Sequence, residues 1–143
     1  MNEPRDSVPA KTGEGHAAEN RRAHILLVDD EPTVLKVMGM SLRALGYTVV
    51  TAGSAKEGLQ VASEAGHPPF DLLITDLRMP DMNGKDFAQR FLRISPDGKV
   101  IFISGLSRAA AEERAGLEAV DQFLPKPVSI IALKQTLAAV LGS

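Results

Sequence analysis

The stretch from Asp71 to Gly84 restricts the possible folds of this chain more than any other. It contains the short apolar run Leu72 to Ile74, which is typical of a strand covered on both faces in a parallel sheet. Asp76 ends that run, and the turn-forming segments Met79-Pro80-Asp81 and Asn83-Gly84 follow it. The Asp76 carboxylate is therefore expected where a strand becomes a loop, at the sheet edge where open α/β folds bind ligands.

Four more short runs predict strands, and three of them also end in polar groups. His24 to Val28 ends in Asp29-Asp30-Glu31, Val100 to Ile103 ends in Ser104-Gly105, and Gln122 to Leu124 ends in Pro125-Lys126-Pro127. The remaining run is Tyr47 to Thr51. Apolar residues at helical spacing lie between these runs and predict helices after Pro32, from Ser54 to about Glu64, from Gly84 to Leu92, from Ser107 and from Ser129.

Five alternations of strand and helix predict an α/β fold, in which a five-stranded parallel sheet carries helices on both faces. All strands of such a sheet point the same way, so the polar groups at their ends meet at one edge. Five side chains that are far apart in the sequence are therefore expected at this edge: Asp29, Asp30, Asp76, Ser104 and Lys126.

Local patterns predict how several helices begin and pack. Asp30 is the expected N-cap of the helix near Pro32, and Ser54 with Glu57 forms a capping-box signature. Gly39 lies inside a helix, where glycine costs about 1 kcal/mol relative to alanine, so we expect close packing against the sheet there. In the last helix the residues expected to face inward are Ile130, Leu133, Leu137 and Val140 or Leu141.

Length and composition restrict the domain organisation. The 143 residues suffice for one domain, and residues 1–23, which have little to bury, predict a flexible tail before a domain of residues 24–143. The absence of cysteine excludes disulfides and thiolate chemistry. The net charge of -2 argues against direct nucleic-acid binding, and no apolar stretch is long enough for a membrane span or secretory signal, so we expect a cytoplasmic protein.

The polar groups expected at the sheet edge could together carry out phosphoryl transfer. Three carboxylates, from Asp29, Asp30 and Asp76, can hold a hard cation such as Mg²⁺, which keeps room for a phosphate oxygen. Lys126 adds a fixed positive charge, and the Ser104 hydroxyl can donate a hydrogen bond to a phosphoryl oxygen. An aspartate carboxylate can attack phosphorus in such a site, and the product is an aspartyl phosphate.

These residues together resemble a known family, the receiver domain of bacterial two-component response regulators. The resemblance rests on four motifs in order: Val28-Asp29-Asp30-Glu31, Asp76 with Met79-Pro80-Asp81-Met82-Asn83-Gly84, Ser104-Gly105, and Lys126-Pro127. It covers about residues 24 to 141 and is closest to the single-domain, chemotaxis-type architecture. The implied fold is flavodoxin-like and doubly wound, with strand order 2-1-3-4-5.

The resemblance also implies a role for each matching residue. Asp76 would accept a phosphoryl group from a phosphohistidine of a sensor kinase or a histidine phosphotransfer protein. Asp29, Asp30, Asp76 and the backbone carbonyl of Arg78 would bind Mg²⁺. Ser104 would move toward the phosphate, and Lys126 would pair with it. Such a domain is a phosphoacceptor that catalyses its own transfer and hydrolysis and is not an ordinary enzyme.

The resemblance implies an output surface as well. Phe123 stands where the family has a switching aromatic residue, although it lacks the hydroxyl of the frequent tyrosine, and Val128 stands where phenylalanine is frequent. The relayed surface would be the fourth helix, fifth strand and fifth helix, about Ser107 to Leu141. The Lys126–Pro127 bond is often cis in such domains. The downstream protein target is unspecified, and the domain would act as a monomer or as a phosphorylation-dependent dimer.

Four other functions fit parts of the pattern. A haloacid-dehalogenase-type phosphatase also uses an aspartate nucleophile, but it needs two aspartates separated by one residue, whereas Asp29 and Asp30 are adjacent. A flavodoxin-like electron carrier would need a loop rich in glycine and hydroxyl groups at the first strand end, where this chain is acidic. An interaction module that acts without phosphorylation and a phosphoryl shuttle stay open as alternatives.

Overall fold

The sheet has the predicted topology. The computed structural model describes residues 23–142, so the predicted tail lies outside the described residues except for Ala23. Within the described part, all paired strands are parallel and their order is β2-β1-β3-β4-β5. The strands are β1 (His24–Val28), β2 (Thr48–Ala52), β3 (Leu72–Asp76), β4 (Lys99–Ser104) and β5 (Gln122–Pro125). The parallel sheet with helices on both faces is what the alternating pattern predicts, and the strand order is the doubly wound, flavodoxin-like one that the resemblance implies.

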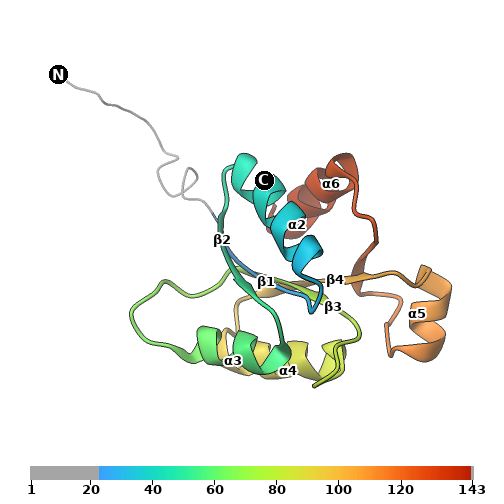
Figure 1. Ribbon diagram of the computed structural model, residues 1–143, viewed down its shortest axis with the longest axis horizontal. Coiled ribbons are helices and arrows are strands. Elements are labelled where there is room, and N and C mark those ends of the chain that lie inside the picture. The colour runs from blue at the N-terminus through green and yellow to red at the C-terminus, as the bar shows by residue number, and fades with distance from the viewer. Residues whose placement is uncertain (1–22, 143) are drawn as a thin grey trace.

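Helices cover both faces of the sheet (Figure 1). They are α2 (Pro32–Ala44), α3 (Ala55–Ser63), α4 (Gly84–Ile94), α5 (Arg108–Arg114) and α6 (Ile130–Leu141). In Figure 1, α2 and α6 lie on one side of the sheet, and α3 and α4 lie on the other. None of the helices in residues 23–142 is long and apolar enough to cross a membrane.

Two apolar clusters, one on each face, hold the layers together. The central strands are buried on both faces, so their successive residues alternate between the clusters: Leu26 and Leu73 belong to one, Leu27 and Leu72 to the other. Phe87 and Phe91 on α4 are fully buried in the first cluster, as their i, i+4 spacing predicts. Burial of two such rings stabilises the α4 layer by about 3 to 6 kcal/mol.

Side-chain caps begin four of the five helices in the described part of the chain. Ser54, Ser107 and Ser129 accept hydrogen bonds from backbone N–H groups in the first turns of α3, α5 and α6, and Asn83 does so for α4. The first half of the predicted capping box is present, because the Ser54 hydroxyl accepts from Glu57 N at 3.1 Å. Glu57 Oε1 accepts instead from Gly53 N at 2.8 Å, one residue before the N-cap N–H that a capping box uses. The sequence therefore determined where these helices start.

Two local predictions were wrong. Asp30 does not cap α2, since the N-cap is Glu31, which makes no side-chain cap, while Asp29 Oδ1 accepts from Glu31 N at 2.9 Å. Any of the three consecutive acids could precede the first turn of the helix. Proline is favoured at the first helical position, so Pro32 places the N-cap at Glu31 rather than at Asp30. Ile130 is 46% exposed and does not face inward, whereas Leu133 and Leu137 are buried as predicted.

His67 is held in the loop after α3 by two carbonyl groups. Its Nδ1 lies 2.7 Å from the Pro68 carbonyl oxygen and its Nε2 lies 2.8 Å from that of Val61. Both ring nitrogens must carry a proton to donate to both oxygens, so these hydrogen bonds favour the charged ring. They raise the pKa of His67, and the bond to Pro68 has the larger effect, followed by the bond to Val61. Nearby His24 stacks on Phe70 at 4.2 Å, and burial, followed by the charge of His67, lowers the pKa of His24.

We therefore expect the two histidines to titrate on opposite sides of the ordinary value of about 6.5. The stabilisation from His67 is complete below about pH 6.5 and is lost as the pH rises through the raised pKa of the folded protein. His67→Gln should remove this contribution to the pH dependence of stability. The unfolding free energy of the variant should therefore change less than that of wild type as the pH rises above 6.5. NMR titration of the imidazole protons, with His67→Gln for assignment, measures both values. A His67 pKa below that of His24 would contradict the expectation.

Candidate functional site

The register of the sheet brings the polar strand ends to one edge. Val28 pairs with Thr75 and Ser104 pairs with Pro125, so the residues that follow lie at the same level of neighbouring strands. Backbone hydrogen bonds continue past the strand ends, from Leu77 N to the Ile103 oxygen at 3.0 Å and from Lys126 N to the Ser104 oxygen at 2.8 Å. The parallel ladder therefore fixes the backbone on which the functional side chains stand.

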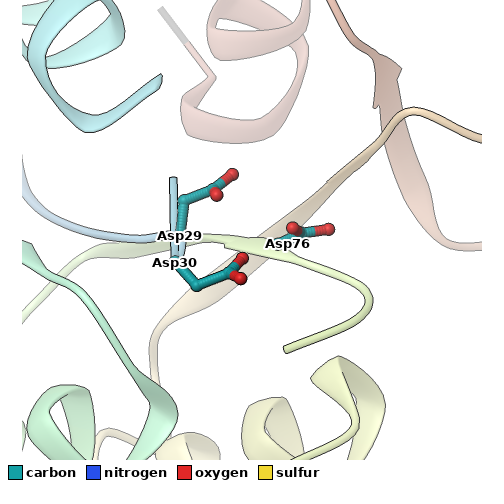
Figure 2. Close-up of side chains that lie close together, drawn as sticks. All are labelled: Asp29, Asp30 and Asp76. Atoms are coloured by element: carbon teal, nitrogen blue, oxygen red, sulfur yellow. The ribbon is translucent and has the colours of Figure 1, made fainter. Parts of the chain in front are cut away.

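Three carboxylates gather at this edge. Asp29 and Asp30 follow β1, and Asp76 ends the neighbouring strand β3 (Figure 2). One carboxylate oxygen of each lies within 4.8 Å of those of the others. Asp29 is fully buried and Asp76 is buried, while Asp30 is exposed. The cluster therefore opens to solvent on the side of Asp30.

Lys126 supplies the positive charge of the site. Its Nζ lies 2.8 Å from Asp29 Oδ2, 3.1 Å from Asp76 Oδ2 and 3.1 Å from Glu31 Oε1. The lysine side chain is 16% exposed, so these contacts lie in a partly desolvated environment, where ion pairs are stronger than at an open surface. Fifty residues of sequence separate Lys126 from Asp76, and the fold brings them together.

The site shifts the protonation equilibria of its two central groups. Burial raises the pKa of Asp76. The contact with Lys126 lowers this pKa, but the negative charge of Asp29 raises it further, and the net shift is upward. Burial lowers the pKa of Lys126, but its contacts with Asp29, Glu31 and Asp76 outweigh burial, so the pKa lies above its usual value. Lys126 is therefore a cation at neutral pH, and the crowded anionic site makes the ionised form of Asp76 less favourable than it is in water.

The loop after Asp76 is fastened to the neighbouring helix. Asp81 Oδ2 accepts from Lys56 N at 2.9 Å and Oδ1 accepts from Ala55 N at 3.4 Å, so this carboxylate caps α3 from another part of the chain. Within the loop, Arg78 and Asn83 form an isolated antiparallel bridge. These contacts fix the loop backbone that carries the Arg78 carbonyl, the predicted fourth protein ligand.

Ser104 lies at the end of β4 and is 3% exposed. Its hydroxyl oxygen accepts a hydrogen bond from Leu106 N at 3.0 Å. The lone proton of a serine hydroxyl stays available for donation in this arrangement. The next residue, Gly105, has no side chain, and a Cβ built on it would meet nothing within 4 Å apart from its chain neighbours.

Phe123 on β5 is half-buried and packs against the first apolar cluster. Arg108, at the start of α5, places its guanidinium carbon 6.0 Å from the centre of the Phe123 ring. The same guanidinium donates through Nη2 to the carbonyl oxygens of Glu118, Ala119 and Asp121, at 3.2, 2.8 and 2.9 Å. Arg108 thus links α5, the loop before β5 and the aromatic side chain.

Three residues at or near the site gained no role from sequence reasoning. Glu31 was recognised only as part of an acidic run, Asp81 only as a turn former, and Arg108 was not singled out. Contacts such as Lys126 to Glu31 and Lys56 N to Asp81 join positions 95 and 25 residues apart, and no local pattern signals them. The acidic run was the one available signal, and it pointed to Glu31 without giving its partner.

The residues present fit a hard divalent cation. Asp29 Oδ2 is buried and pairs with Lys126 Nζ at 2.8 Å, and the remaining lone pairs of this carboxylate oxygen can bind a cation. Three carboxylates with oxygens this close repel one another, and a bound divalent cation relieves that repulsion. The all-oxygen donor set matches the preference of Mg²⁺.

Comparisons with known proteins agree with this geometry. Residues 25–138 match the model of the response regulator receiver domain. The transcriptional regulatory protein GlrR of Escherichia coli K12 is 38% identical over 118 residues, which are 82% of this chain and 26% of GlrR. The sensor kinase CckA of Brucella abortus is 35% identical over 119 residues, which are 83% of this chain and 12% of CckA. This chain thus spans about a quarter of GlrR and about an eighth of CckA.

A solved structure gives the same result for the fold. The crystal structure of a response regulator receiver domain protein from Clostridium thermocellum superposes with a TM-score of 0.71 and 32% sequence identity. The match covers 84% of this chain and 94% of that one. Sequence, topology and the acidic strand ends therefore agree, and the chain belongs to the response regulator receiver domain family of two-component phosphorelay systems.

Proposed function

We propose that this domain accepts a phosphoryl group on Asp76 from a phosphohistidine of a sensor kinase or histidine phosphotransfer protein. The observation that carries the proposal is the convergence of Asp29, Asp30 and Asp76 within 4.8 Å, with Lys126 Nζ 3.1 Å from Asp76 Oδ2. An isolated carboxylate is a poor nucleophile toward an anionic phosphoryl group because the charges repel. The surrounding groups in this site reduce that repulsion.

In the proposed reaction, a carboxylate oxygen of Asp76 forms a bond to phosphorus. The bond between phosphorus and the donor imidazole nitrogen breaks, and its electron pair stays on the imidazole. Lys126 pairs with the developing negative charge on the phosphoryl oxygens, and the Ser104 hydroxyl donates a hydrogen bond to one of them. Water later attacks the acyl phosphate, which regenerates the carboxylate and releases inorganic phosphate.

Asp29, Asp30, Asp76 and the Arg78 carbonyl would hold Mg²⁺ in this site. When bound, Mg²⁺ neutralises charge on the transferred phosphoryl group and orients it. The support within the described residues is the donor set itself: three carboxylates, each with an oxygen within 4.8 Å of those of the others. The Asp81 contact with α3 supports the Arg78 assignment, because it holds the loop that carries this carbonyl.

We also infer that phosphorylation changes partner binding through α5, β5 and α6. Phe123 is half-buried beneath Arg108, so movement of Ser104 on the adjacent strand can alter how this ring packs. Exposed apolar side chains on this part of the chain, Val120, Ile130 and Ile131, could contact a protein target. Donor and target would meet the domain in the cytoplasm, and the domain would act as a monomer or as a phosphorylation-dependent dimer.

The proposal is tested by the intact mass of the full chain after incubation with acetyl phosphate, with Mg²⁺ and with EDTA. We expect one phosphoryl group to be added in Mg²⁺ and none in EDTA. Borohydride reduces an acyl phosphate to an alcohol and so converts the labelled aspartate to homoserine, which peptide mass spectrometry should locate at Asp76. No addition under conditions that label a known receiver would favour an interaction module that works without phosphorylation.

A further inference from the structure

Glu31 directs its side chain away from its own helix. It is the N-cap residue of α2, yet it makes no side-chain hydrogen bond to that helix. N-cap side chains ordinarily accept from the second or third N–H of their helix, which contributes about 1 kcal/mol. Here Glu31 Oε1 instead lies 3.1 Å from Lys126 Nζ, 95 residues away in the sequence.

Lys126 has no donor left over in this arrangement. An ammonium group has three N–H donors, and three carboxylates surround it: Asp29 at 2.8 Å, Glu31 at 3.1 Å and Asp76 at 3.1 Å. An incoming phosphoryl oxygen can therefore pair with Lys126 only if one of these carboxylates gives up its contact. Glu31 is the partner most able to leave, since its side chain is 59% exposed while those of Asp29 and Asp76 are 0% and 10% exposed.

Glu31 also stands apart from the other acids of the site. Asp29 and Asp76 belong to the group that could hold a metal ion, and Glu31 does not. Lys126 keeps these two buried carboxylates as partners when the Glu31 contact is given up. Glu31 adds a fourth negative charge beside Lys126, at the place that the negatively charged phosphodonor has to approach, and so repels it.

We propose that the Glu31 carboxylate contacts Lys126 in the place that a phosphoryl oxygen takes during transfer, and that this contact slows phosphoryl transfer to Asp76. Glu31 is thus a positioning residue that acts through Lys126. The inference rests on the proposed function, because it concerns the rate of that reaction. In the reaction the Asp76 oxygen bonds to phosphorus, the donor bond breaks, and Lys126 exchanges the Glu31 carboxylate for a phosphoryl oxygen.

The test is the rate of phosphorylation by acetyl phosphate at fixed Mg²⁺ concentration. Glu31→Gln removes the charge, and we expect a rate roughly threefold to fivefold higher than that of wild type, as is typical of one exposed ion pair. Glu31→Asp keeps the charge but is too short for the contact, so its rate should also rise if the contact itself matters. Glu113→Gln, the same change at an exposed position of α5, is the matched control and should leave the rate unchanged.

Two further measurements separate this role from a structural one. Mg²⁺ affinity, measured by NMR titration, should stay within about twofold in Glu31→Gln, whereas a distorted β1 end would weaken it. Beryllofluoride mimics a phosphoryl group on an aspartate, and the concentration that half-saturates the protein should fall roughly threefold to fivefold in Glu31→Gln.

Each outcome decides between the two proposals. Normal labelling of wild type with an equal or lower rate in Glu31→Gln refutes the role of Glu31 and leaves the proposed function intact. A higher rate in Glu31→Gln with Glu31→Asp equal to wild type also refutes it, because charge alone then explains the effect. A wild type that takes neither phosphoryl group nor beryllofluoride refutes both.

Discussion

Replacing Asp76 by Asn is expected to abolish phosphoryl addition while leaving the fold at least as stable as that of wild type. The amide has the size of the carboxylate but no nucleophilic oxygen, so labelling should fall on the order of a thousandfold or more. Lys126 keeps Asp29 and Glu31 as partners in the variant, so no buried charge loses its only partner. Intact mass after acetyl phosphate treatment, with Asp97→Asn as an exposed control, measures the effect.

The stability part of this expectation follows from the crowding of charge around Asp76. Its pKa is raised by burial, against the effect of Lys126, and also by the charge of Asp29. A raised pKa means that this group stabilises the fold below its unfolded value of about 3.9 and that this stabilisation is lost as the pH rises through the folded pKa. Neutral asparagine avoids that loss. We therefore expect a higher melting temperature for Asp76→Asn at pH 7 in EDTA, and a difference from wild type that shrinks toward pH 4.

A variant that is less stable than wild type at pH 7 would contradict the crowding argument. A variant that is still labelled would place the acceptor elsewhere. The acids of the site would then have to be replaced one at a time to find it. The two measurements are independent, because one reports the acceptor atom and the other reports the electrostatic cost of keeping it ionised.

Gly84→Ala is expected to destabilise the domain by about 3 kcal/mol, the upper part of the usual range for overpacking. A Cβ at this position would collide with the Asp76 carbonyl oxygen and lie 2.7 Å from Leu77 Cα. Both atoms are backbone, so neither can rotate away. Gly84 N also donates to the Leu77 oxygen at 2.7 Å, which holds the start of α4 against the end of β3. Urea denaturation followed by circular dichroism measures the change.

Gly39→Ala is the matched control for this substitution. Gly39 lies inside α2, and its added Cβ would meet the flexible Arg43 side chain at 3.3 Å and Thr51 Cγ2 at 3.8 Å. Alanine favours a helix interior by up to about 1 kcal/mol over glycine, so this variant should be as stable as wild type or more stable. Equal losses in the two variants would show that the backbone contact at Gly84 carries no special weight.

The fold could be predicted because its signals are local and repeated. Short apolar runs such as Leu72 to Ile74, separated by helical spacing, fix five alternating units, and parallel strand direction then brings Asp29, Asp76 and Lys126 to one edge. Helix starts at Ser54 and Ser129 followed from side-chain capping, which depends on residues three positions apart. The parallel sheet and the edge that carries the candidate site follow from these short-range rules, whereas the strand order was expected only from the family resemblance.

Finer features escaped prediction because they depend on distant contacts or on small shifts in register. Any of three consecutive acids could cap α2, so placing the cap at Asp30 was an error of one residue. Ile130 has the spacing of an inward residue, but it lies in the first turn of α6, where the core no longer reaches it. The contacts of Glu31, Asp81 and Arg108 exist only once the fold has joined separate segments.

The segments on the two sides of the acidic site differ in how firmly they are packed. On one side Asp81 fastens the loop after Asp76 to α3, and Gly84 packs directly against the strand end. On the other side α5 buries only Ala111 among its seven residues, and Gly105 has open space beside it. The loop after Asp76 is therefore more firmly packed than the α5 side. If Asp76 is phosphorylated as proposed, we expect the backbone to move on the α5 side and to stay in place beside α3.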